Sequence, residues 1–277
     1  MGKDEEARVD RARGRVFGEV AELYEASRPG YADAPAARVL EYAEPGERPA
    51  LEVGAGTGKA TVAFAEAGTS PVCVEPDPRM AEVLRRNTAP FPRVRVEAAG
   101  FEEWRRDGRR FGLLYAATSW HWLDPARRRD LVREALDPGG ALALFWNPHG
   151  VRAPRLHGAP AEVDARHGIT GTPHGVLASS YGRAAGGGRL GRGAGLARGR
   201  APRRRRVHRP ARGPFPRGPA LRHRPLPGLP GLPLPLPGPG PDHRERVLAD
   251  TAGVLDAHGG GIAMEHFSDL LLARTAR

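Results

Sequence analysis

The chain has 277 residues, enough for one full domain with additions, and its single cysteine excludes both an intrachain disulfide framework and a cysteine-only zinc site. No run approaches the roughly 18 consecutive apolar residues of a membrane span, and the charged N-terminal stretch lacks the apolar run of a secretory signal. We therefore expect a soluble, cytoplasmic protein with no metal site.

The net charge of +11 is confined to one part of the chain. Residues 151–242 hold 17 arginines, no lysine and three acidic residues, which gives that segment a net charge of +14. The rest of the chain, with 26 basic and 29 acidic residues, is net −3. The positive net charge therefore comes from one segment, and it does not indicate that the protein as a whole binds nucleic acid.

The first zone, residues 1–149, alternates strand-like and helix-like stretches, which predicts a parallel sheet with covering helices. The predicted strands are Ala50–Val53, Pro71–Glu75, Arg93–Glu97, Phe111–Ala117 and Ala141–Trp146. The predicted helices are Lys59–Ala67, Pro78–Asn87 and Pro125–Leu136, with Asp77 and Asp124 as caps of the second and third. Asp137-Pro138-Gly139-Gly140 predicts a helix stop followed by a turn.

Three glycines, Gly54, Gly56 and Gly58, lie between the first strand and the first of these helices, in Leu51-Glu-Val-Gly-Ala-Gly-Thr-Gly58. Glycines at such a junction permit a tight turn and the close approach of a ligand. A dinucleotide fingerprint would place its third glycine at position 59, which is Lys59 here. Glu75 ends the second strand about 20 residues after the first glycines, where a carboxylate can accept the hydroxyls of a ribose.

With Glu52 before it, this G-x-G-x-G pattern resembles class I S-adenosylmethionine-dependent methyltransferases, and the resemblance covers most of the first zone. It implies a Rossmann-like α/β fold with S-adenosylmethionine as cofactor. Glu52 and the three glycines would hold the methionine end of the cofactor, and Glu75 with Pro76 would hold the ribose. Phe101 and Glu102, after the third strand, would lie near the adenine.

Two further motifs resemble one subgroup of that family. Phe17–Tyr31 is similar to the subgroup's N-terminal cap, which implies that Tyr24, Arg28 and Tyr31 lie over the cofactor, with Arg28 beside the methionine carboxylate. Ala116–Pro125, with its Trp120-His121-Trp122, is similar to the loop after the fourth strand, which borders the methyl-transfer pocket. Thr118 would contact the cofactor there, and Trp120, Trp122 and Asn147 would join Tyr31 on the acceptor side.

His121 is the candidate general base, required only if the acceptor must lose a proton. A structural role for this histidine is the alternative. Trp120 and Trp122 fit either the core or a pocket where they pack on the sulfonium. Glu75 could be a solvated strand-end charge, Arg28 a surface ion-pair partner, and Lys59 no more than the start of a helix.

The middle zone, residues 150–241, is rich in Arg, Pro, Gly and Ala, and its proline density is incompatible with long helices and central strands. We expect disorder there. Its lack of lysine and near-lack of aromatic residues disfavour nucleic-acid binding and suggest out-of-frame translation of a GC-rich gene, a compensated frameshift that translating all three frames would test.

The last zone, residues 242–277, returns to globular texture, with a helix predicted over Arg244–Ala257 and a strand over Phe267–Ala273. We expect both to belong to the same domain, the strand being an edge without its usual partner, which would impair turnover. The predicted activity is methyl transfer to a small-molecule acceptor. The alternatives are a nicotinamide-dependent oxidoreductase of the same fold and a basic nucleic-acid-binding protein.

Overall fold

The computed structural model describes part of the chain in two compact units. The described residues are 18, 21–28, 30–31, 33–147, 149–151, 159–168, 221–222, 241–257, 261–262, 264–266 and 269–276. Within the 150–241 segment, Ala159–Arg166 form a helix, so the expected disorder is wrong there. Most of the segment lies outside the described residues, and for those residues the disorder and the frameshift stay hypotheses. Among the described helices, none has the length and apolarity needed to cross a membrane.

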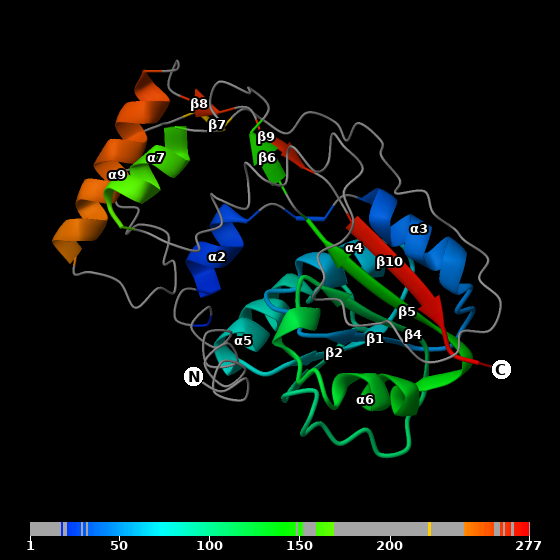
Figure 1. Cartoon of the computed structure of the whole chain (residues 1–277). Coiled ribbons are helices and arrows are strands. Elements are labelled where there is room, and N and C mark those ends of the chain that lie inside the picture. Colours follow the sequence, from blue (N-terminus) through cyan, green and yellow to red (C-terminus); the bar gives the residue numbers. More distant parts are fainter. Residues whose placement is uncertain are drawn as a thin grey trace. The chain divides into compact units, whose positions relative to one another are not determined.

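The first unit is a six-stranded α/β sheet (Figure 1). The strand order is β10 (Asp269–Arg274), β5 (Leu136–Trp146), β4 (Phe111–Ala117), β1 (Ala50–Val53), β2 (Pro71–Glu75) and β3 (Arg95–Ala98). The pairs β1–β2, β1–β4, β2–β3 and β4–β5 are parallel. The predicted Rossmann-like class is confirmed, and three of the five predicted parallel strands have the bounds that the sequence predicts.

Helices cover both faces of this sheet (Figure 1). The helices of this unit are α2 (Ala21–Ser27), α3 (Asp33–Ala43), α4 (Lys59–Glu66), α5 (Pro78–Asn87) and α6 (Arg128–Ala135). Side chains alternate along each strand: Leu114 faces the cluster that contains Val132 of α6, whereas Tyr115 faces Phe64 of α4. Asp77 caps α5 as predicted, its Oδ1 accepting from the Arg79 N–H at 2.8 Å.

The segment Asp137–Gly140 is not the turn that the sequence predicts. It lies within β5, where Phe111 pairs with Leu136 and Leu113 pairs with Ala141, so that four residues bulge from the ladder. A side chain at Gly140 would lie 2.9 Å from the Asp137 carbonyl oxygen, so this bulge requires a glycine. Helix α6, which precedes β5, begins at Arg128 and not at Pro125, where the sequence predicts its start.

The C-terminal strand β10 lies at the edge of the described sheet, beside β5. Just past β10, the Thr275 N–H donates to the Gly140 carbonyl at 2.9 Å, and the Gly139 N–H donates to the Ala276 carbonyl at 3.2 Å. Residue numbers rise from 275 to 276 on one strand while their partners fall from 140 to 139 on the other, so the pairing is antiparallel.

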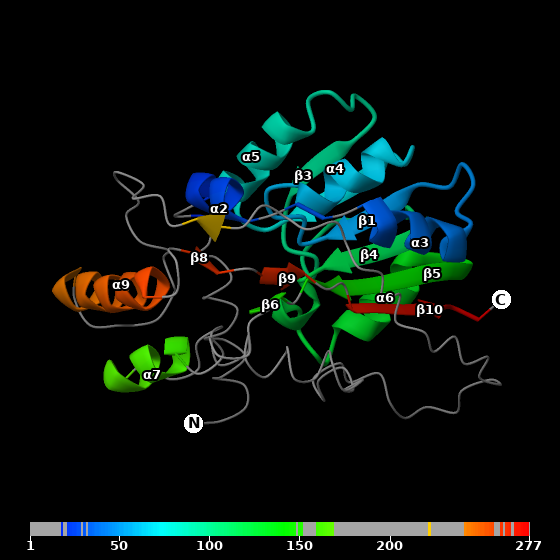
Figure 2. The same cartoon turned by 90° about the horizontal axis from the view of Figure 1, so that it is seen from above.

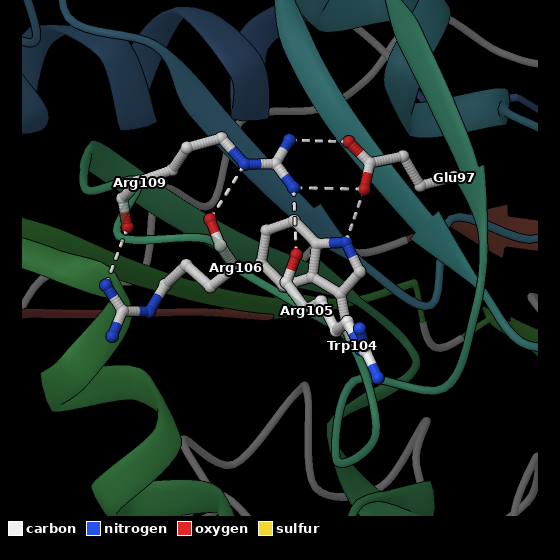
Figure 3. A network of polar contacts seen from close by, with 5 residues as sticks. All are labelled: Glu97, Trp104, Arg105, Arg106 and Arg109. Atoms are coloured by element: carbon white, nitrogen blue, oxygen red, sulfur yellow. Dashed lines mark hydrogen bonds and ion pairs between the residues drawn. The ribbon is translucent and has the colours of Figure 1, made fainter.

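At the opposite edge, a polar network holds the loop after β3 (Figure 3). Arg109 forms a two-point ion pair with Glu97, with nitrogen–oxygen distances of 2.6 and 3.1 Å, and its guanidinium lies 4.8 Å from the ring centroid of Trp104. The Trp104 indole N–H donates to the same carboxylate, and Arg109 also donates to the Arg105 and Arg106 carbonyls. The network attaches residues 104–109 to the edge strand β3.

The described part of the second unit consists of two helices and short strand pairs. Its elements are β6 (His149–Val151), α7 (Ala159–Arg166), β7 (Leu221–Arg222), α9 (Pro241–Asp256), β8 (Gly261–Ile262) and β9 (Met264–His266). Asp250 of α9 accepts from Arg166 and pairs with His167 at 3.0 and 2.8 Å, which holds the two helices together. The helix predicted over Arg244–Ala257 is therefore present and begins three residues earlier.

Candidate active site

The sheet has a topological switch point between β1 and β4. From β1 the chain continues to β2 and β3 on one side, whereas β4 and β5 lie on the other. In open α/β sheets, ligands bind at the carboxyl ends of the two strands flanking such a point, where the connections diverge. The residues that follow β1 are the glycines at 54, 56 and 58, and those that follow β4 are Thr118 and Ser119.

Glycine is required at positions 54 and 56 of the loop after β1 for two different physical reasons. A Cβ at Gly54 would lie 2.6 Å from the Ser119 Cβ, so the tips of β1 and β4 touch there. A Cβ at Gly56, whose φ is +58°, would meet no atom of the described chain within 4 Å. The loop is therefore closed against β4 at Gly54 and open at Gly56, the arrangement expected where a ligand lies against bare backbone.

Glu75 lies next to that opening. One carboxylate oxygen accepts from the Gly56 N–H at 2.7 Å and the other from the Asp77 N–H at 3.0 Å. The residue is 6% exposed, and no basic side chain in the described part of the chain forms an ion pair with it. Burial raises the pKa of Glu75 above its ordinary value. A buried carboxylate held only by backbone donors retains lone pairs for further hydroxyl donors.

Glu52 lies in β1, two residues before Gly54. It is fully buried, and one oxygen accepts from Thr61 Oγ1 at 2.6 Å and from the Tyr115 hydroxyl at 3.0 Å. Cys73 Sγ lies 3.8 Å from the same oxygen. Burial raises the pKa of Glu52 to about 7. This carboxyl group thus joins β1 to α4, β4 and β2 inside the core.

The cap helix α2 lies beside α5 (Figures 1 and 2). Ala21 and Tyr24 pack on Met80 and Val83 of α5. Two ion pairs extend this contact: Lys59 at the start of α4 with Glu25 at 3.0 Å, and Arg86 with Glu22 at 2.8 Å. Sequence reasoning treated Lys59 only as a helix start, because its partner lies 34 residues away.

The segment after α2 reaches the tip of β4. The Arg28 guanidinium carbon lies 5.3 Å from the ring centroid of Tyr24. The Tyr31 hydroxyl is hydrogen-bonded to Thr118 Oγ1 at 3.0 Å, and its ring packs edge-on against Phe145. Tyr31 and Thr118, predicted from separate motifs, are thus brought together.

The motif after β4 divides between core and surface. Trp120 is 2% exposed within the apolar cluster on the α6 face, and Arg128 lies over its ring at 4.7 Å. His121 is exposed and Trp122 half-buried, with ring centroids 4.5 Å apart. Of the two interpretations of Trp120, the geometry favours the core.

The remaining predicted residues vary in position. Phe101 is 5% exposed in the core, and Glu102 accepts from the Asp124 N–H at 2.8 Å, which joins the loops after β3 and β4. Pro76 is exposed beside Glu75. Asn147 follows β5 at the start of the second unit, so its place at the site stays a prediction. Sequence reasoning missed Ser119, whose hydroxyl donates to the Val53 carbonyl; its position directly after Thr118 was the available signal.

Residues 50–140 match a family model described as a methyltransferase domain. This segment therefore resembles methyltransferase domains. The chain is 38% identical over 136 residues to uncharacterized methyltransferases of Mycobacterium bovis and Mycobacterium tuberculosis, a match that covers 49% of this chain. The chain spans about half the length of these curated relatives, 54%.

The methyltransferase fold also extends beyond the matched segment. A solved structure of a candidate type II methyltransferase from Anaeromyxobacter dehalogenans superposes with a TM-score of 0.52 at 22% identity. That comparison covers 90% of this chain and 99% of the other. At this identity it supports the fold alone.

Proposed function

We propose that this domain binds S-adenosylmethionine and transfers its methyl group to a small-molecule acceptor. The observation that carries the proposal is the pairing of an open backbone position at Gly56 with the buried, cation-free carboxylate of Glu75 beside it. A ribose that donates its hydroxyls to Glu75 would supply the partners that this buried carboxylate lacks. The adjoining Thr57 hydroxyl is also buried and has no hydrogen-bond partner within the described residues.

The same loop fits a dinucleotide less well. In a dinucleotide fold the third glycine permits close packing of helix and strand. Here the third glycine, Gly58, packs against helix α5 and not against a strand, since a Cβ on it would lie 2.5 Å from Leu84 Cδ1. Position 59 carries a lysine whose ammonium group is engaged by Glu25.

The bound cofactor would supply an electrophilic methyl group on a sulfonium. Because charge is largely neutralised as that methyl moves, the protein contributes mainly by orienting the reactants, which can be worth about 7–11 kcal/mol. In the proposal, the glycine loop and Glu75 hold the cofactor, and Arg28 lies near its carboxylate. Glu52, which accepts from the Thr61 and Tyr115 hydroxyls, would fix the end of β1 that leads into the loop.

The acceptor would enter beside the Trp120–Trp122 loop. His121 is the proposed general base for acceptors that carry a proton, since it is exposed there. Trp122 would offer a ring face to the sulfonium. A small-molecule acceptor in the cytoplasm is the proposed setting: the one cysteine is buried and unpaired, and the arginines of the 150–241 segment lack the aromatic residues that stack on nucleic-acid bases.

Titration calorimetry of the whole chain with S-adenosylhomocysteine and, separately, with NAD tests the proposal. We expect binding of the first and not of the second. Glu75→Gln should weaken that binding about 10- to 100-fold, the range for losing hydrogen bonds to a charged group. Glu82→Gln, on an exposed position of α5, is the matched control. A folded chain that binds NAD and not S-adenosylhomocysteine would overturn the proposal.

A further inference from the structure

Thr118 has an unusual backbone conformation at the tip of β4. Its φ is +60°, in the left-handed region that a β-branched residue rarely adopts. Such conformations persist only where surrounding contacts over-determine them, and they cluster at functional sites. The conformation of Thr118 therefore calls for contacts that hold it.

Contacts from three directions hold this turn. The Thr118 N–H donates to the Phe145 carbonyl of β5 at 2.8 Å, and the neighbouring Ser119 hydroxyl donates to the Val53 carbonyl of β1. The third contact is the hydrogen bond between Thr118 Oγ1 and the Tyr31 hydroxyl. The first two lie within the sheet, whereas the third comes from the cap, 87 residues earlier in the chain.

Tyr31 is fixed at two points. Its ring lies edge-on to Phe145, with centroids 5.2 Å apart at 88°, and its hydroxyl reaches Thr118. Burial raises the pKa of Tyr31 to about 12, so the hydroxyl keeps its hydrogen at neutral pH. The two attachments can be separated experimentally, because phenylalanine keeps the ring and removes only the hydroxyl.

We propose that Tyr31 and Thr118 act together as positioning residues, whose hydrogen bond holds the Arg28–Tyr31 segment of the cap over the carboxyl end of β4. This inference rests on the proposed function: with the segment held there, the cofactor is enclosed where the tips of β1 and β4 meet. The strained backbone of Thr118 directs its hydroxyl to that bond. Neither residue takes part in proton transfer.

A mutant cycle tests the pair in the full chain. Tyr31→Phe and Thr118→Ala should each weaken S-adenosylhomocysteine binding about 2- to 10-fold, the worth of one net hydrogen bond, and the double variant should be no weaker than the weaker-binding single variant. Thr118→Ser should restore most of the affinity that Thr118→Ala loses. Tyr42→Phe, on α3, is the control and should bind like the wild type.

Amide hydrogen exchange of the ligand-free chain gives a second readout. The Arg28 amide, whose N–H donates to the Tyr24 carbonyl at 3.0 Å, should exchange faster in Tyr31→Phe and Thr118→Ala, but not in Tyr42→Phe. Additive losses of affinity, or wild-type affinity and exchange in Tyr31→Phe, would overturn this inference alone. A folded wild-type chain that does not bind the ligand would overturn the proposed function, and the inference with it.

Discussion

Glu52 and Glu75 are two carboxylates on neighbouring strands, and the fold gives them different surroundings. Both were predicted to contact the cofactor. Glu75 lies at the open end of the loop with backbone partners only, whereas Glu52 is enclosed by hydroxyl groups of α4 and β4. The sequence could indicate that Glu52 faces away from its strand neighbours, but not which side chains from other elements surround it.

Alanine substitutions at two positions of the glycine loop should have different effects, one mainly on ligand binding and the other mainly on the stability of the fold. Gly56→Ala should cost the fold only the strain of a left-handed alanine, about 1–2 kcal/mol, while its methyl group enters the open position and abolishes S-adenosylhomocysteine binding. Gly54→Ala should unfold at clearly lower temperature, because overpacking against Ser119 adds about 1–3 kcal/mol to that strain. Thermal unfolding and calorimetry of both variants check this. Gly56→Ala that binds like the wild type would contradict it.

At the scale of elements, α2 depends on contacts that no local pattern reveals. Lys59→Met should lower the free energy of local unfolding of α2 by about 1–3 kcal/mol, because the largely buried Glu25 carboxylate loses its cationic partner. Hydrogen exchange of the α2 amides should therefore accelerate.

The second ion pair of α2 is the natural control. Arg86→Gln removes an exposed ion pair, so its effect should be smaller and should decrease in 0.5 M salt, at which the screening length is about 4–5 Å. Equal effects of the two substitutions would contradict the difference in burial.

The network at β3 predicts a dependence on pH. The Arg109 guanidinium lowers the pKa of Glu97, so the ion pair stabilises the fold above the ordinary pKa of a glutamate, and this contribution is lost as the pH falls through the lowered value. Glu97→Gln should lower stability by about 1 kcal/mol at pH 7, since the pair is partly exposed. Urea unfolding should show the difference from wild type shrinking towards pH 3. The exposed α6 variant Glu134→Gln should show no such change.

At the scale of the whole molecule, alternation of strand and helix texture was sufficient to predict the sheet, its parallel strands and the switch-point loop. It could not predict the pairing of β10 with β5, since that contact joins Thr275 to Gly140 across 135 residues. The turn that it predicted at Asp137–Gly140 is wrong, because these residues form a bulge that depends on the pairing of β5 with β4. The candidate site residues are predictions from local motifs, whereas the Lys59–Glu25 and Tyr31–Thr118 contacts could not be predicted because they depend on the tertiary structure.

The buried Glu52 should affect the stability of the whole first unit. Since its folded pKa is about 7, against an ordinary 4.5, the unfolded chain releases this proton first as the pH rises. Stability should therefore fall between about pH 4.5 and 7, on the order of 2 kcal/mol, and level off above. Glu52→Gln, whose amide can donate to the Thr61 and Tyr115 hydroxyls, should remove most of this decline. Parallel pH profiles of urea unfolding would contradict the assignment.

Glu75 is proposed to hold the ribose of an adenosyl ligand. The most direct measurement compares the affinities of S-adenosylhomocysteine and its 2′,3′-dideoxy analogue for the wild-type chain and for Glu75→Gln. We expect the wild type to bind S-adenosylhomocysteine about 10-fold or more tightly than the dideoxy analogue, and Glu75→Gln to bind the two ligands nearly alike. The same preference in both proteins would contradict it.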